Sequence, residues 1–121
     1  MSASTPKPAK IPNERRRRRH PRYQGDFEVI VTHLLGDSYQ KLQGHCRDLS
    51  QAGIGILLAA ELNVGEVTSL SFSLSRSTSP WVVRAVVRYR RGYHYGFEFL
   101  SLTSDQQESL KSYTNNLQPL D

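Results

Sequence analysis

The chain has 121 residues and a formal net charge of +5, enough chain for one domain with a modest core. Residues 15–22 hold six arginines and no acid, whereas residues 23–121 carry a formal charge of −2, which argues against a basic nucleic-acid-binding face. No apolar run is long enough to span a bilayer and no signal peptide is recognisable, so we expect no membrane contact and a cytoplasmic location.

The N-terminal part is polar and lacks any hydrophobic period. We predict a disordered tail over residues 1–13, followed by a flexible arginine arm over residues 14–23. Pro21 blocks a helix there and favours an extended conformation at His20.

Residues 24–102 alternate apolar and polar side chains with the period of β-strands. The alternation predicts six short strands, at residues 27–32, 39–46, 53–58, 67–74, 81–89 and 94–100. Turn residues separate them, including a tight polar turn over residues 48–53. In the fifth strand, we expect Tyr89 on the same face as Val87, and Arg88 and Arg90 on a solvated opposite face.

Residues 103–117 change to a helical period. Thr103 or Ser104 can cap the helix, and Leu110, Tyr113 and Leu117 then recur on one face. Six strands in a meander with one terminal helix predict a mainly all-β fold, a small six-stranded antiparallel β-barrel with a C-terminal α-helix. Trp81, at the start of the fifth strand, is expected to pack in this fold and not to stack on a ligand.

The arginine arm can bind anions. Guanidinium groups are planar and always charged, and they fork onto phosphates or onto the O6/N7 edge of guanine. Taken alone, the arm favours a different interpretation, a solvated polybasic tract that binds any polyanion.

A second polar segment supplies different chemistry. Asp48 offers acceptors that match the N1–H and N2–H₂ edge of guanine, and the Ser50 hydroxyl can reach a phosphate or cap the turn. Gly53 can adopt a positive φ or leave an unobstructed approach for a ligand. A plain turn between two strands, with no ligand, is the alternative interpretation.

Taken together, the two segments resemble the PilZ domain family. Its members carry R-x-x-x-R and (D/N)-x-S-x-x-G motifs, which bind the bacterial second messenger cyclic di-GMP. The matching residues are Arg18-x-x-x-Arg22 and Asp48-x-Ser50-x-x-Gly53, and the resemblance covers residues 14–117. Arg15-x-x-x-Arg19 also fits the first motif. We prefer Arg18 and Arg22 because the family's second arginine commonly follows a proline-like kink just before the first strand.

The resemblance implies roles for individual residues. Arg18 and Arg22 would contact guanine and phosphate, Asp48 would read a guanine edge, and Ser50 and Gly53 would shape the floor of the pocket. Arg17 matches a position that influences whether one ligand or an intercalated pair binds, and it resembles the type that binds two molecules per chain. Arg16 and Tyr89 are further candidate contacts.

The sequence contains no arrangement of residues typical of an enzyme, a cofactor site or a metal site. We therefore predict a cyclic di-GMP receptor and adaptor that changes conformation on binding and signals to a protein partner, without binding nucleic acid. The alternative is a PilZ-like protein-interaction module that does not bind nucleotide.

Overall fold

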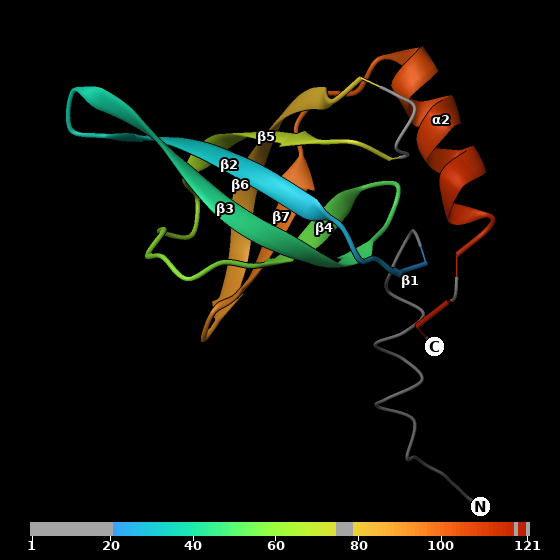
Figure 1. Cartoon of the computed structure of the whole chain (residues 1–121), viewed down its shortest axis with the longest axis horizontal. Coiled ribbons are helices and arrows are strands. Elements are labelled where there is room, and N and C mark those ends of the chain that lie inside the picture. Colours follow the sequence, from blue (N-terminus) through green and yellow to red (C-terminus); the bar gives the residue numbers. More distant parts are fainter. Residues whose placement is uncertain (1–20, 75–78, 118, 121) are drawn as a thin grey trace, which may run out of the picture.

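The structure is a computed structural model, and it describes residues 21–74, 79–117 and 119–120. Within these residues the chain forms seven strands and one helix (Figure 1). The strands are β1 (Tyr23–Gln24), β2 (Glu28–Leu35), β3 (Ser38–Leu49), β4 (Gly53–Leu57), β5 (Val67–Phe72), β6 (Trp81–Arg91) and β7 (His94–Phe99), and the helix is α2 (Ser104–Thr114).

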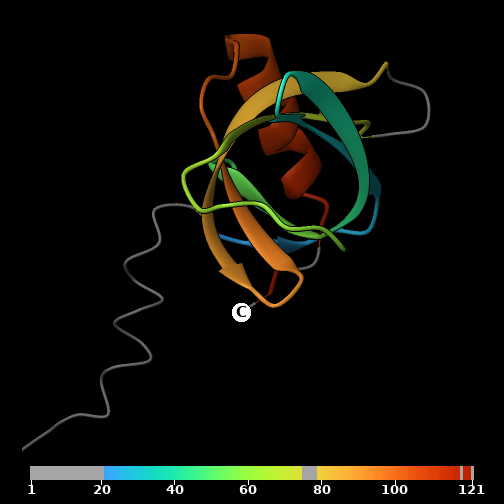
Figure 2. The ribbon, with the colours of Figure 1, turned by 90° about the vertical axis from the view of Figure 1, so that its left-hand side faces the viewer.

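Strands β2 to β7 close into a barrel in which every neighbouring pair is antiparallel. The order is β3-β2-β5-β6-β7-β4, and pairing of β4 with β3 completes the ring, as the view along the barrel shows (Figure 2). The predicted six-stranded barrel with a C-terminal helix is therefore confirmed, but the predicted meander is wrong, because β4 pairs with β3 and β7 while β5 pairs with β2 and β6. The short strand β1, which was not predicted, pairs with the end of β3.

Alternating side chains of the strands fill the barrel, as their period of two predicts. In β2, for example, Val29 and Val31 are fully buried while Glu28, next to Val29, is exposed. Leu70 of β5 and Val87 of β6 are also fully buried and contribute to the same core. The sequence pattern thus gives the correct inner face for most of the barrel.

Helix α2 covers one end of the barrel. Thr103 caps it: the Thr103 hydroxyl accepts from the Gln106 amide N–H, and the Gln106 side chain accepts from the Thr103 N–H. Leu110 of this helix is fully buried. The helix ends at Thr114 and not at the predicted residue 117, because two asparagines follow, although Leu117 still packs against the core.

Aromatic side chains join α2 to the barrel. Phe72 packs against Phe27, Trp81 and Phe99 with ring centroids 5.5, 5.9 and 6.4 Å away, and Phe27 meets Tyr113 of the helix edge-on. Trp81 is therefore a packing residue, as expected. Among the described residues, no helix has the length and apolar composition needed to cross a bilayer.

The end of the arginine arm is held by backbone contacts. In β1, Tyr23 pairs with Leu49 and Gln24 with Asp48. On the other side, the Leu120 N–H donates to the Arg22 carbonyl at 3.1 Å. Arg22 is therefore fixed where β1 meets the end of β3.

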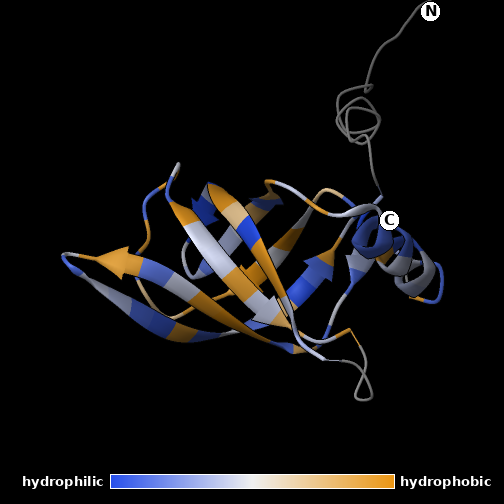
Figure 3. Ribbon diagram, turned by 90° about the horizontal axis from the view of Figure 1, so that it is seen from above, coloured by the Kyte–Doolittle hydropathy of each residue, from blue (hydrophilic) through white to orange (hydrophobic). Residues whose placement is uncertain are grey.

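The β2–β3 hairpin projects from the barrel at the end opposite to α2 (Figure 1). Strand β2 pairs with β3 along its whole length but with β5 only at residues 30–32. The end of β2 is hydrophobic in Figure 3.

Candidate ligand-binding site

Four residues on neighbouring strands form a cross-strand row on the outer face of the barrel. Asp48 of β3 pairs with Gly55 of β4, Gly55 pairs with Gly96 of β7, and Gly96 pairs with Tyr89 of β6. The two central positions are glycines, so only the two ends of the row carry side chains. We call this arrangement the Asp48–Tyr89 row.

Two β-bulges bring the ends of the row to the outer face. The pairing of β3 shifts register between Cys46 and Asp48, and that of β6 shifts between Val87 and Tyr89. Cys46 and Val87 are fully buried. An extra residue in each strand reverses the alternation, so the side chain two positions later points outward and not into the core.

The bulge in β6 overturns one prediction. Tyr89 does not share the inner face of Val87, because the inserted Arg88 moves Tyr89 to the outer face. The same reversal moves Arg90 away from the solvated face, and its guanidinium lies 5.3 Å from the ring centroid of the buried Tyr95.

The glycines of the row are required by close packing. A Cβ atom on Gly55 would collide with the carboxylate of Asp48, and one on Gly96 would collide with the ring of Tyr89. The carboxylate and the phenol ring therefore lie over the two glycines and approach each other across the row.

Arg22 joins the two ends of the row. Its Nη1 donates to Oδ1 of Asp48 at 3.1 Å and to the Tyr89 hydroxyl at 3.4 Å. Burial lowers the pKa of the guanidinium, but the interactions with the Tyr89 hydroxyl and with the Asp48 carboxylate outweigh burial and raise the pKa above its ordinary value. Arg22 is thus a cation held between the Asp48 carboxylate and the Tyr89 hydroxyl.

Asp48 lies in a strand, although the sequence pattern placed it in a turn. Strand β3 runs on to Leu49 because its last residues pair with both β4 and β1. The buried Cys46 supports this bulge, since its thiol donates to the Asp48 carbonyl at 3.4 Å. Burial, with the nearby charge of Asp48, raises the pKa of the Cys46 thiol to about 12, so the thiol stays protonated at neutral pH.

Ser50 and Gly53 shape the turn between β3 and β4. The Ser50 hydroxyl oxygen accepts from the N–H groups of Ala52 and Gly53, both at 3.1 Å. Gly53 does not supply a positive φ. It is needed for close approach, because a Cβ there would collide with the Phe97 carbonyl oxygen.

A cavity of about 210 Å³ lies beside the row. Arg22, Ser50, Gly53 and Tyr89 line it, together with a group that the sequence did not single out for the site. That group is Ala52, Ile54, Arg88, Gly96, Phe97 and Glu98. The structure therefore brings Arg22, Asp48, Ser50, Gly53 and Tyr89 together, while their part in binding stays a prediction. Arg16, Arg17 and Arg18 lie outside the described residues.

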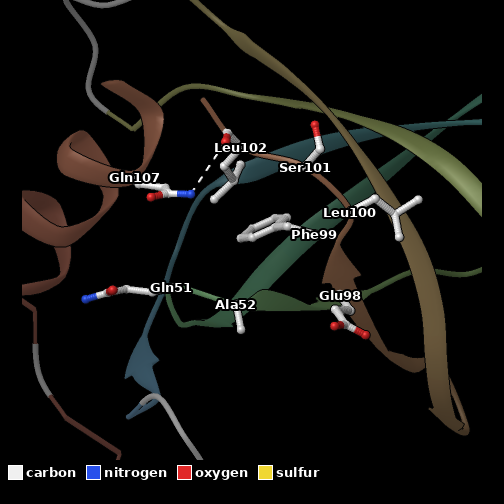
Figure 4. A pocket seen from close by; sticks show the side chains of 8 residues that line it. All are labelled: Gln51, Ala52, Glu98, Phe99, Leu100, Ser101, Leu102 and Gln107. Carbon is white, nitrogen blue, oxygen red and sulfur yellow. Dashed lines mark hydrogen bonds between the residues drawn. The ribbon is translucent and has the colours of Figure 1, made fainter. Parts of the chain in front are cut away.

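A larger hollow of about 460 Å³ lies between the Ser50–Gly53 turn and α2. Figure 4 shows Gln107 of the helix and Gln51 of the turn on its helix side, with Glu98 on the strand side. This hollow contains neither an arginine nor Asp48. Its chemistry suits an anionic ligand less well than the cavity beside the row.

Three polar side chains near the row were missed as candidates. Nε2 of His94 lies 3.5 Å from Oδ2 of Asp48, and its ring meets Tyr89 edge-on at 5.7 Å. Arg88 donates to Glu98 at 2.5 Å within the cavity wall. The period of two from Gly96 could have placed His94 and Glu98 on the outer face, but nothing local marks them as site residues.

A comparison with models of known protein families finds one match. The PilZ domain matches residues 16–116. A sequence search of curated proteins finds no match.

Among solved structures, the chain is similar to the cyclic di-GMP-bound PilZ domain of YcgR from Escherichia coli. The TM-score is 0.66 at 22% identity, covering 84% of this chain and 91% of that one. The Bacillus subtilis inhibitor of motility MotI matches with a TM-score of 0.67 at 20% identity, covering 82% of this chain and 49% of that one. The PilZ domain of CeSA from a cellulose-synthesizing bacterium gives 0.59 at 17%, covering 78% and 94%. These likenesses agree with the barrel and its helix, and the family match over residues 16–116 shows that the chain belongs to the PilZ domain family.

Proposed function

We propose that this chain is a receptor for cyclic di-GMP and acts as an adaptor rather than an enzyme. The observation that carries the proposal is the convergence of Arg22, Asp48 and Tyr89 over two glycines, in a chain with both PilZ motifs. The similar PilZ domain of YcgR from Escherichia coli is a complex with cyclic di-GMP, which supports the same ligand here.

The chemistry of the Asp48–Tyr89 row suits a guanine nucleotide. A base in the cavity can stack on the Tyr89 ring, which lies over Gly96 and is held by Arg22. Asp48 presents carboxylate acceptors for the N1–H and N2–H₂ edge of guanine. Arg22 supplies a planar cation for a phosphate or for the O6/N7 edge.

The arm supplies the remaining cations. Arg18 of the first motif, with Arg17 and Arg16 beside it, would close over the phosphates from the side on which Arg22 is anchored. Neutralisation of several arginines by one ligand would dock the arm on the barrel and create a new surface for a protein partner.

The first prediction concerns ligand choice and Arg22. Cyclic di-GMP should bind much more tightly than GTP or cyclic di-AMP at physiological salt, because Asp48 reads guanine and the fixed arginine pairs with phosphate. Arg22→Ala should cost about 1–3 kcal/mol of binding free energy, roughly 5- to 150-fold in Kd, measured by calorimetry.

Arg84→Ala is the matched control, since it removes the same charge from an exposed position of β6 outside the cavity. If both alanine variants lose affinity equally, and all nucleotides bind alike and release with salt, only nonspecific attraction to basic residues is at work. No binding of cyclic di-GMP would favour the alternative, a protein-interaction module that does not bind nucleotide.

The second prediction concerns the floor of the row. Gly96→Ala should push the Tyr89 ring away from Arg22 and weaken cyclic di-GMP binding by about tenfold, which corresponds to about 1.4 kcal/mol. Tyr89→Ala should remove the same interaction, so the double variant should bind about as well as either single one. Additive losses measured by calorimetry would show that Gly96 acts independently of the ring.

The third prediction concerns stoichiometry. An extra guanidinium at Arg17 should support an intercalated pair of ligands, because the pair gathers four phosphates and stacked guanines in one place. Calorimetry should therefore give two cyclic di-GMP molecules per chain, falling toward one in Arg17→Leu. Arg15→Leu, which lies outside the preferred motif, should leave the value at two. A plateau at one for the unaltered chain would contradict this stoichiometry but leave the receptor assignment intact.

A further inference from the structure

A groove opens at the end of the barrel away from α2, where β2 separates from β5. Its volume is about 550 Å³. The lining residues are His33, Leu34, Leu35, Glu61, Asn63, Glu66 and Val67. None of them belongs to the Asp48–Tyr89 row.

The groove has exposed apolar side chains. Leu34 is 54% exposed, Leu35 60% and Val67 44%. Tyr39 lies opposite Leu34 in the hairpin, and Val64 follows Asn63; both are also exposed. Apolar side chains gathered on one small region of surface, unlike single ones, mark a place where another molecule binds.

The groove is also acidic. The Glu61 side chain is 87% exposed. Its carboxylate lies 3.7 Å from the guanidinium of Arg90, which is not one of the residues that line the groove. Glu66 is fixed at the groove wall: Oε2 contacts Nδ1 of His33 at 2.8 Å and Oε1 accepts from the Asn63 N–H at 3.1 Å. The lining residues include two carboxylates and no lysine or arginine, so the groove favours a cationic partner.

A strand edge borders the groove. Pairing between β2 and β5 covers residues 30–32 of β2 only, yet β2 continues to Leu35. Among the described strands, none pairs with residues 33–35 on the edge away from β3. Such an edge can accept an added strand from another protein.

We propose that this groove is the docking site for the protein partner, and that the partner contributes an extended segment in which apolar and basic side chains alternate. The backbone of the segment would pair with the free edge of β2. Its apolar side chains would contact Leu34 and Val67, which lie on one face of β2 and β5, and its basic ones would face Glu61. This inference rests on the adaptor role proposed above.

The groove is connected to the proposed ligand site. Arg90 follows Tyr89 in the chain and reaches Glu61 at the groove. The Tyr95 hydroxyl, one residue before Gly96, donates to the Ala60 carbonyl at 2.5 Å and accepts from the Leu62 N–H at 3.1 Å. Residues 60–62, which include Glu61 of the groove, therefore contact β6 and β7. These two strands carry Tyr89 and Gly96 of the row.

The test uses two capped peptides, Lys-Val-Lys-Val-Lys and Glu-Val-Glu-Val-Glu, titrated into the full chain and followed by amide-resolved NMR. The basic peptide should bind at least about tenfold more tightly than the acidic one and should shift the amides of residues 33–35 and 61–67. Glu61→Lys should reverse the preference, because Glu61 is exposed and its change leaves the core intact. Leu34→Ser should weaken the binding of both peptides, because it removes an exposed apolar contact without adding a charge.

Each other outcome overturns the proposal. No saturable shift, equal binding of the two peptides, or shifts confined to other surfaces would exclude this occupant. A concentration-dependent dimer that Leu34→Ser dissociates would assign the groove to a second copy of the chain. Cyclic di-GMP calorimetry and thermal unfolding of both variants separate the two proposals. Unaltered nucleotide binding, with a reversed peptide preference in Glu61→Lys and weakened peptide binding in Leu34→Ser, supports the groove. Failure of nucleotide binding in the unaltered chain contradicts the receptor assignment alone.

Discussion

The site depends on a constraint of the barrel, the reversal of side-chain direction by two β-bulges. In a regular strand, Asp48 would point to the same side as Cys46, and Tyr89 to the same side as Val87, which is the core. One inserted residue in each strand moves the carboxylate and the phenol to the outer face. The two side chains then lie over the glycines between them, and Arg22 can bridge them.

Further contacts around the site stabilise this arrangement. Pairing of β1 with β3, and of the C-terminal segment with Arg22, holds the base of the arginine arm beside Asp48. The neutral thiol of Cys46 donates to the Asp48 carbonyl at one bulge without placing a charge in the core. The turn at Ser50 is closed by its own hydroxyl, which brings Gly53 against β7. The fold thus fixes a cation, a carboxylate and an aromatic ring before any ligand arrives.

Sequence periodicity predicted most of the fold, because a side chain that alternates between core and solvent leaves a regular trace in the chain. It gave the barrel strands and the capped helix, and the two motifs located Arg22, Asp48, Ser50 and Gly53. The periodicity did not predict the two bulges. A single inserted residue such as Arg88 has no distinctive composition, and only the pairing partner on the next strand reveals it. His94 and Glu98 were missed for a related reason: each is an ordinary polar residue on a strand face, and its proximity to Asp48 or Arg88 depends on which strands become neighbours in the closed barrel.

The most direct test of the account is to locate the ligand on the barrel. An amide-resolved NMR titration with cyclic di-GMP should perturb Asp48 and Tyr89, together with Gly55 and Gly96, the two backbone positions that lie beneath their side chains. The hollow beside α2, with Gln51 and Gln107, should show smaller changes. Saturable perturbation centred on that hollow, with the glycines of the row unaffected, would contradict the account.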